Sequence, residues 1–354
     1  MTVLDNRALN RALLARQLLD RRRVMPALDA VEHLVGLQGQ EPHEPYVGLW
    51  SRLDGFRPPE LAELLENRRV VRTLLMRRTI HLVSAADCLA LRSLHQPMLE
   101  ARTYAVLRRR LEGVDLAELR AAGQPHFERE PRTLPDVGRA VGARWPDVAP
   151  RDLGDALSSL VPLVQVPPRG VWGVKAPARN TTIEAWLGSP VSPASSADDL
   201  VLRYLRAFGP ASSSDIRAWS GLSGLRESIQ RLRPRLRSFR DVRGRELLDV
   251  LDAPLPDPAT PAPPRFLPAF DNVVLGFDDR TRVIDNAHRG LSVAGARFLL
   301  VDGRVAGTWT ITPDALRVTM LTSQPASELD AVAAEGEDLL AWHGIQGRIV
   351  IDAG

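Results

Sequence analysis

Residues 198–250 read DDLVLRYLRAFGPASSSDIRAWSGLSGLRESIQRLRPRLRSFRDVRGRELLDV, and this stretch decides the fold of the chain. The segment 198–208 predicts a helix, because its apolar side chains recur at helical spacing: Leu200, Val201, Leu205 and Phe208. Gly209-Pro210 ends that helix, and Ser212–Ser214 offer caps for a second helix that runs through Trp219. The stretch therefore opens with two helices joined by a short turn.

A third helix and a β-hairpin complete the pattern. Gly221 makes a turn, and residues 224–232 predict a recognition-type helix. Two short strands are expected at 238–242 and 246–250, joined through Arg243-Gly244. Three helices followed by a hairpin is the order of a winged helix, a variant of the helix-turn-helix that binds DNA. Winged helices also bind proteins, so the pattern alone leaves the partner open.

The same order can be traced twice more along the chain. Near its start, helices are predicted at 10–21, 26–37 and 60–67, with a hairpin at 70–76 and 79–83. In the middle, helices are predicted at 116–128, 134–144 and 151–159, with strands at 163–166 and 170–174. Thr133 is the expected cap of the middle helix in that set.

Two segments rich in proline are expected to be linkers. The segment 189–197 separates the second and third units, and the segment 252–264 precedes the last domain. Strands dominate from residue 266, at 272–277, 281–284, 297–301, 304–312 and 316–321, before a helix at 328–340. The sequence thus predicts an α+β fold in four parts: a first winged-helix unit with following helices (1–115), a second unit (116–190), a third unit (196–256) and a β-barrel-like domain (257–354).

Composition narrows the class of protein. The chain has 354 residues, 44% of them hydrophobic, which is enough for several domains with a substantial core. It lacks a long apolar run and a secretory signal, so a cytoplasmic protein is expected, with no membrane partner. Cys88 is the only cysteine, and the seven histidines lack metal-ligand spacing. We therefore expect neither a metal nor a cofactor.

The basic side chains are almost all arginine, since Lys175 is the only lysine. Three clusters lie near the predicted winged-helix units: Arg68, Arg69, Arg72, Arg77 and Arg78; Arg108–Arg110; and Arg231, Arg233, Arg235 and Arg237. Guanidinium groups suit phosphate contact, so DNA contacts are expected from Arg72, Arg77, Arg78, Arg231 and Arg233. A codon bias toward arginine, or solvated helix faces for the second cluster, would explain the same residues without DNA.

A pair of glutamines carries the chemistry. Residues 37–47 read LQGQEPHEPYV, at the end of the amphipathic segment 26–37. Gly39 loosens the backbone, and Pro42 disfavours helix at Glu41. In extended backbone, Gln38 and Gln40 lie on one face and can act together, whereas on a helix they would point apart. Taken alone, the pair favours a polar helix end with solvated amides, because a Q-x-Q sequence is common.

Further short motifs lie along nearly the whole chain. The segments NRALLARQ (10–17), LQGQEP (37–42), YVGLW (46–50), RTIHLV (78–83), PPRFLPAFDN (263–272) and DRTRVI (279–284) occur in this order. Together they make the chain resemble the AlkZ/YcaQ family of DNA glycosylases over nearly its whole length. Gln38 and Gln40 match the Q-x-Q motif of the AlkZ-like branch, and the sister branch has Q-x-D. Gly39 departs from the aliphatic residue usual between them.

The resemblance implies a fold and an activity. Tandem winged helices and a β-rich domain would form a C-shaped body around a DNA channel, acting as a monomer on double-stranded DNA near the nucleoid. Gln38 and Gln40 would hold the water that hydrolyses an N-glycosidic bond. The implied substrates are N7-alkylguanine adducts, including bulky or cross-linked ones from genotoxins. General repair and self-resistance to an antibiotic both fit such an activity.

The chemistry agrees with that substrate class. An amide cannot take a proton at neutral pH, but its carbonyl accepts hydrogen bonds from water. Such weak catalysts suffice when the base is already primed to leave, as a cationic N7-alkylpurine is. No lysine lies near the motif in sequence, so a Schiff-base lyase step is not expected.

Other roles stay open at this point. His81 is expected either to make a structural hydrogen bond in its strand or to contact DNA. Asp271 and Asn272 are expected either to stabilise the last domain or to lie near the channel. The whole chain could instead be a winged-helix regulator without catalytic activity, or a protein that binds and sequesters an adduct.

Overall fold

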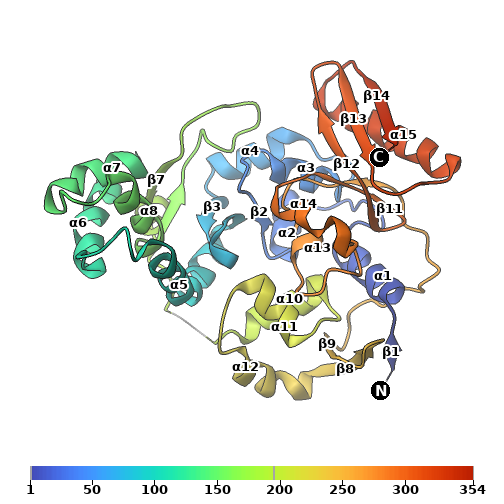
Figure 1. Ribbon diagram of the computed structural model, residues 1–354, viewed down its shortest axis with the longest axis horizontal. Coiled ribbons are helices and arrows are strands. Elements are labelled where there is room, and N and C mark those ends of the chain that lie inside the picture. Colours follow the sequence, from blue (N-terminus) through green and yellow to red (C-terminus); the bar gives the residue numbers. More distant parts are fainter. Residues whose placement is uncertain (1, 194–195, 354) are drawn as a thin grey trace.

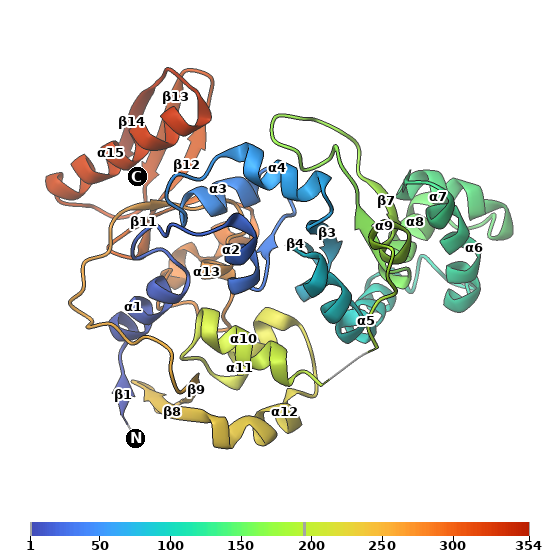
Figure 2. The ribbon, with the colours of Figure 1, turned by 180° about the vertical axis from the view of Figure 1, so that it is seen from behind.

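The computed structural model describes residues 2–193 and 196–353, and within them the strands form three sheets (Figure 1). In the views from front and back, helices α6–α8 lie at one end of the molecule, and the C-terminal sheet with α15 lies at the other (Figures 1 and 2). No helix of the described part is long and apolar enough to cross a membrane.

The N-terminal part contains β1 (Val3–Leu4), α1 (Asn6–Arg16), α2 (Ala27–His33), β2 (Leu37–Gln38), α3 (Glu44–Trp50), α4 (Pro58–Glu66), β3 (Val70–Leu74), a 3₁₀ turn η1 (Met76–Arg78), β4 (Ile80–Ser84) and α5 (Ala85–Leu107). The predicted hairpin is present, since β3 and β4 pair antiparallel. Helix α2 ends at His33, earlier than predicted, because Val35 has a φ of 56° and the Gly36 amide bonds to the Val31 carbonyl at 2.9 Å.

The middle part contains α6 (Leu116–Arg129), β5 (Arg132–Thr133), α7 (Leu134–Val141), η2 (Gly142–Arg144), α8 (Pro150–Leu160), β6 (Leu163–Gln165), β7 (Arg179–Thr182) and α9 (Ile183–Leu187). Thr133 caps α7 as predicted. The strand predicted at 170–174 is wrong, because the strand that pairs with β6 is β7. The earlier segment is held by side chains instead: the Tyr46 hydroxyl donates to the Gly170 carbonyl at 2.8 Å.

The two hairpins are not separate wings. The six-stranded sheet has the order β2-β4-β3-β6-β7-β5, and all of its pairings are antiparallel. Strand β3 lies between β4 and β6, so its edge is covered by a strand from the middle part of the chain. One continuous sheet therefore joins the N-terminal part to helices α6–α8.

Residues 198–250 have the predicted order. They form α10 (Asp198–Phe208), α11 (Ser213–Ser220), α12 (Leu225–Leu232), η3 (Arg233–Arg235), β8 (Leu236–Asp241) and β9 (Glu246–Val250). Ser212 caps α11 and shares a capping box with Asp215. Strand β1 adds to β8 in parallel, so the hairpin is part of a three-stranded sheet. Of the linker predicted just before α10, residues 194–195 lie outside the described part of the chain.

The C-terminal part contains β10 (Arg265–Phe266), α13 (Asn272–Leu275), η4 (Asn286–His288), α14 (Arg289–Val293), β11 (Phe298–Val301), β12 (Arg304–Ile311), β13 (Ala315–Met320), α15 (Ala326–His343) and β14 (Arg348–Ala353). These strands form an open five-stranded sheet, so the predicted barrel is wrong. Strand β14 runs parallel to β13 because α15 carries the chain back between them.

Two strands predicted in this part are also wrong. Asn272 begins a helix because the Asp271 carboxylate caps it, accepting from the Val273 amide at 2.8 Å. Residues 281–284 form a turn, in which the Val283 and Ile284 amides both bond to the Arg280 carbonyl at 2.9 Å.

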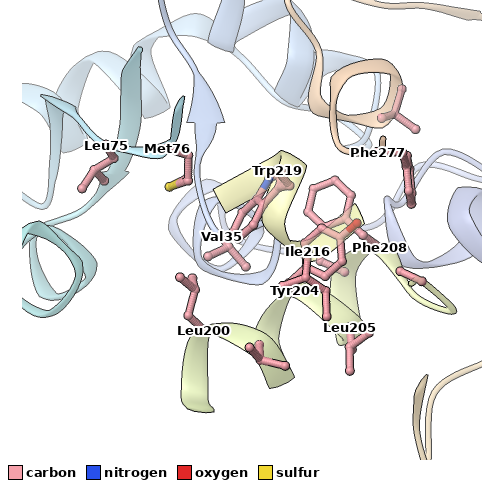
Figure 3. Close-up of a cluster of buried hydrophobic side chains, with 14 of the residues drawn as sticks. Val35, Leu75, Met76, Leu200, Tyr204, Leu205, Phe208, Ile216, Trp219 and Phe277 are labelled. Atoms are coloured by element: carbon pink, nitrogen blue, oxygen red, sulfur yellow. The ribbon is translucent and has the colours of Figure 1, made fainter. Parts of the chain in front are cut away.

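The largest hydrophobic cluster is shared between parts of the chain. Tyr204, Phe208 and Trp219 of the third unit pack with ring centroids 4.9 to 5.6 Å apart. Val35, Leu75 and Met76 from the N-terminal part and Phe277 from the C-terminal part surround the same cluster (Figure 3). A separate cluster lies within residues 107–163 and gives α6–α8 a core of their own.

A buried ion pair fixes the C-terminal part to the segment that follows α3. The Arg52 guanidinium donates to both Asp271 oxygens at 2.9 Å, and the two side chains are only 1% and 2% exposed. We expect Arg52→Ala to lower the free energy of unfolding by about 3–5 kcal/mol, because it leaves the Asp271 carboxylate buried without its cation. Urea unfolding measures this change.

Arg139→Ala is the matched control, since Arg139 is paired with Asp136 on the surface, where its side chain is 63% exposed. It should leave the urea midpoint nearly unchanged. Equal midpoint losses in the two variants would contradict a special role for the buried pair.

Candidate functional site

The two glutamines lie beside strand β4. Gln38 is the last residue of β2 and stands opposite His81 in the antiparallel register. The Gly39 amide continues the pairing, donating to the Ile80 carbonyl at 2.8 Å. The backbone is therefore extended at Gln38, as the sequence predicted. The two side chains differ in environment, however, because Gln38 is buried and Gln40 is exposed.

Each glutamine carbonyl accepts one hydrogen bond from the protein. Arg77 Nη2 donates to Gln38 Oε1 at 2.6 Å, and the Ile80 amide donates to Gln40 Oε1 at 3.3 Å. Arginine and a backbone N–H can only donate, so both amide oxygens must face these groups and both NH₂ ends must face away. A carbonyl oxygen has two lone pairs, so each glutamine can still accept a hydrogen bond from water.

Arg77 joins three parts of the chain at this site. Besides Gln38, it donates through Nη2 to Asn272 Oδ1 at 2.8 Å and through Nη1 to the Trp219 carbonyl at 2.8 Å. Its backbone has a φ of 58°, a conformation that costs a non-glycine residue free energy and is concentrated at functional sites. Gly221 permits the close approach, because a Cβ there would lie 3.1 Å from the Arg77 nitrogen.

The charge of Arg77 has no carboxylate among these three acceptors. Burial, followed by the nearby Arg280 and Arg102, lowers the pKa of Arg77 to about 10. The guanidinium therefore stays charged at neutral pH. Its acceptors at 2.6 to 2.8 Å favour a positioning role over the phosphate contact expected from the sequence.

Asn272 belongs to the same site, which resolves one alternative that the sequence left open. It is the first residue of α13, whose Asp271 cap is held by Arg52. The preceding Phe270 has a φ of 62°, which turns the chain sharply into the helix. Asn272 is 6% exposed, and its Nδ2 has no hydrogen-bond partner in the described part of the chain. Asp271 therefore stabilises the start of α13, and Asn272 faces Arg77.

His81 is completely buried opposite Gln38. Its Nδ1 bonds to the Thr79 carbonyl at 3.1 Å, which makes Nδ1 the protonated nitrogen because a carbonyl only accepts. Burial, followed by the charge of Arg77, lowers the pKa of His81 to about 3, so the ring is neutral at pH 7. A side chain this deeply enclosed favours the structural alternative over DNA contact.

Arg72 and Arg78 also point into the protein. Arg72 is 1% exposed, and its Nη2 donates to the Gly39 carbonyl at 2.8 Å. Burial lowers its pKa to about 10, so it supports the glutamine segment as a buried cation. Arg78 is half-buried, and its Nε donates to the Thr103 hydroxyl of α5 at 3.0 Å. In this conformation neither side chain offers a free guanidinium to phosphate.

The arginines of the third unit lie on the surface. Arg231 pairs with Asp198 at 2.8 Å, and Arg233 pairs with Glu246 at 2.5 Å. Arg217 and Arg226, which the sequence did not single out, are exposed and make no ion pair within residues 2–193 and 196–353. Both line a cavity of about 800 Å³ formed by α11, α12 and β9.

The cavity adjoins a second hollow beside the Arg77 turn. A smaller hollow of about 360 Å³ shares Arg217 with it and is also lined by Arg102 and Gly221. Gly221 packs directly on the Arg77 backbone. Arg102, Arg217 and Asp278 therefore line the surface beside the Arg77 turn.

A second groove, of about 750 Å³, begins at the residue after Gln40. It is lined by Glu41, His43, Lys175, Arg297 and Trp309, among others. Lys175 is exposed there and faces a groove that neither Gln38 nor Arg77 lines.

The chain is similar to known proteins in both sequence and fold. The sequence model of a family described as DNA glycosylase AlkZ-like matches residues 31–342. Among solved structures, DNA glycosylase AlkZ of Streptomyces sahachiroi is similar, with a TM-score of 0.82 and 21% sequence identity over 100% of both chains. At that identity the likeness shows the fold. No curated protein matches the chain.

The contact between Gly39 and Arg72 generates a prediction. A Cβ at Gly39 would lie 3.1 Å from Arg72 Nη1 and 3.4 Å from Pro45 Cγ. Gly39→Ala should therefore displace the segment by a few tenths of an ångström, and Gly39→Val should displace it further. We expect turnover to fall in the order glycine, alanine, valine, while affinity for undamaged duplex DNA stays constant. Single-turnover kinetics and fluorescence anisotropy measure the two quantities.

Gly55→Ala is the control for introducing a methyl group, because no atom lies within 4 Å of its Cβ position. Because Gly55 has a φ of 70°, alanine there should lower the stability of the protein somewhat, but Gly55 lies outside the site. Wild-type turnover in Gly39→Val would contradict the tight packing.

Proposed function

The chain belongs to the AlkZ-like DNA glycosylase family, and from that premise we propose that it hydrolyses the N-glycosidic bond of N7-alkylguanine adducts. The substrate class includes bulky and cross-linked adducts made by genotoxins. The observation that carries the proposal is the glutamine pair, whose two carbonyls are held by Arg77 and the Ile80 amide. Each retains a lone pair for water.

The proposed reaction uses that water as the nucleophile. The C1′–N9 bond breaks, its electron pair goes to the departing purine, and the water oxygen bonds to C1′. The water proton passes to solvent, because an amide cannot hold it at neutral pH. Gln38 and Gln40 accept hydrogen bonds from the water and place partial negative charge near the oxocarbenium-like transition state. An abasic site remains.

The charge of the site supports a cationic adduct as substrate. Glycosidases with neutral leaving sugars use carboxylates, whose full charge and basicity assist the reaction. Here both residues are amides, so the leaving group must supply the driving force. N7-alkylation makes guanine cationic, and the base then departs as a neutral molecule. Amides that hold water suffice for such a substrate.

We propose that Arg77 is a positioning residue in this reaction. Its guanidinium fixes which end of the Gln38 amide faces Arg77, and the same nitrogen also donates to Asn272. A lyase step is not proposed, because the only lysine, Lys175, lines the separate groove with Glu41. A Schiff base at C1′ would need an amine at the glutamine site.

Double-stranded DNA is the proposed partner. We propose three winged-helix units, at 1–115, 116–190 and 196–256, of which the first two share one six-stranded sheet, and a C-terminal part at 257–354, arranged as a C around a DNA channel. The protein would act as a monomer at the nucleoid. A non-catalytic regulator or an adduct-sequestering protein is the competing reading. Incubation with DNA that contains N7-methylguanine, followed by alkaline cleavage, separates them, because only a glycosylase leaves abasic sites.

The roles of the glutamines predict a kinetic result. Gln40→Ala should slow base release by about 100- to 1000-fold, the loss typical of one hydrogen-bonding group that acts in the transition state. Affinity for damaged DNA should stay nearly constant. Gln40→Asp imitates the sister branch and should retain part of the activity. Single-turnover base release and equilibrium binding are the measurements.

The pH profile is the companion measurement. His81 is neutral above a pKa of about 3, and Arg77 is charged below a pKa of about 10, so neither changes charge between about pH 5 and pH 9. The amides do not titrate. The rate of base release should therefore be flat in this range. Wild-type rates in Gln40→Ala would place the reaction elsewhere.

The surface arginines predict a salt dependence. Each phosphate neutralised contributes about 0.9 to the slope of log affinity against log salt. Replacing Arg217 and Arg226 by alanine should lower that slope by about 1.8, since both guanidiniums are exposed and unpaired. Replacing Arg231 and Arg233 should lower it less, because each must first leave its carboxylate. An equal effect of the two pairs, or none from the first, would contradict this assignment.

A further inference from the structure

Asn272 has one hydrogen-bonding group that the protein does not use. Its Oδ1 accepts from Arg77 Nη2 at 2.8 Å, and its Nδ2 has no partner in the described part of the chain. The side chain is 6% exposed. A buried donor without a partner costs free energy, and native proteins rarely leave one unpaired. Other buried side-chain nitrogens in the described part of the chain also lack a partner, but the Asn272 side chain is bonded to the same guanidinium as Gln38.

The orientation of this amide is fixed by chemistry. Because Arg77 can only donate, Asn272 must turn its oxygen toward the guanidinium and its NH₂ group away from it. The same argument applies to Gln38, so Arg77 aligns both amides. Asn272 cannot swing free, since the Asp271 cap and its ion pair with Arg52 fix the start of α13.

The charge of Arg77 indicates which part of a nucleotide lies nearby. A fixed cation disfavours the positive charge that develops on the sugar. It favours the purine, which receives the electron pair as the bond breaks. The Arg77–Asn272 side of the site therefore suits the leaving base, whereas the free lone pairs of the glutamines suit the water.

We propose that Asn272 is a catalytic residue that donates a hydrogen bond from Nδ2 to an acceptor atom of the departing purine. The inference rests on the proposed glycosylase function. Electron density on the base rises as the bond breaks, so this hydrogen bond strengthens in the transition state. A purine ring nitrogen and the guanine carbonyl are acceptors of the required kind. A phosphate oxygen has the same chemistry, and the test separates it from the base.

Two variants of similar shape test the proposal. Asn272→Asp keeps an acceptor for Arg77, forms an ion pair with it and loses the Nδ2 donor, whereas Asn272→Leu loses acceptor and donor but leaves the charge of Arg77 unpaired. We expect each to slow single-turnover base release by roughly 100-fold, the loss typical of one transition-state hydrogen bond. Asn180→Asp is the matched control. Asn180 is 5% exposed in β7, and its Nδ2 donates to the Ala178 carbonyl, far along the chain from the site. It should keep wild-type rates.

A base-free duplex separates the two kinds of acceptor. DNA with a tetrahydrofuran abasic analogue retains the phosphates and lacks the base, so the Asn272 variants should bind it with wild-type affinity. Weaker binding of both variants to this duplex would assign Nδ2 to a phosphate and overturn the proposal. Wild-type base release by Asn272→Asp would also overturn it, because Asn272 would then act only through Arg77.

Wild-type base release by Asn272→Asp overturns the proposal even if the leucine variant does not fold. Thermal melting of each variant verifies the fold. Failure of the proposed function would appear differently, as absence of base release from the wild-type protein itself.

Discussion

One half-buried arginine determines the geometry on which the candidate site depends. Arg77 donates to Gln38, Asn272 and the Trp219 carbonyl, which come from three parts of the chain. A cation withdrawn from water requires acceptors, and these three are neutral, so none cancels its charge. A carboxylate at position 38 would instead form an ion pair with Arg77 and lose much of its capacity to polarise water. The amide at Gln38 is thus the side chain that Arg77 can orient without being neutralised.

The sheet architecture supports the same geometry. Strand β4 pairs with β2 on one side and with β3 on the other, and β3 in turn pairs with β6. The glutamine segment, the Arg77 turn and helices α6–α8 are consequently connected through backbone hydrogen bonds. Residues 198–250 and α13 approach the turn through the aromatic cluster around Trp219 and Phe277. The position of Arg77 is therefore fixed by backbone pairing on one side and by side-chain packing on the other.

Local patterns predicted the parts of the structure that local interactions determine. The helices and hairpin of 198–250, the Thr133 cap and the extended backbone at Gln38 follow from periodicity, capping and glycine placement. The family resemblance is confirmed by the match over residues 31–342. The pairing of β3 with β6 joins distant segments, and no short pattern encodes it. The strand predicted at 272–277 is wrong because this segment has strand-like composition but starts with an N-cap at Asp271.

The same distinction applies to the site. Arginines near a predicted wing were expected to contact phosphate, because sequence shows charge but not direction. Arg72, Arg77 and Arg78 point inward, each with acceptors on distant segments. The sequence did carry a signal for Asn272, because Asp271 and Asn272 form a polar pair directly after Phe270. Its role depends on Arg77, which is nearly two hundred residues earlier, and only the tertiary structure brings the two together.

The use of arginine for every interior cation leaves the chain with a single ε-amine. Arg16, Arg52, Arg72 and Arg92 are among its largest fully buried side chains, whereas Lys175 is exposed at the groove that starts beside Gln40. Amine-selective reagents discriminate between these two chemistries, because guanidinium stays protonated where an amine reacts. A fluorophore coupled to lysine would therefore report from one defined place, the groove that Glu41 also lines, and would leave the interior charges intact.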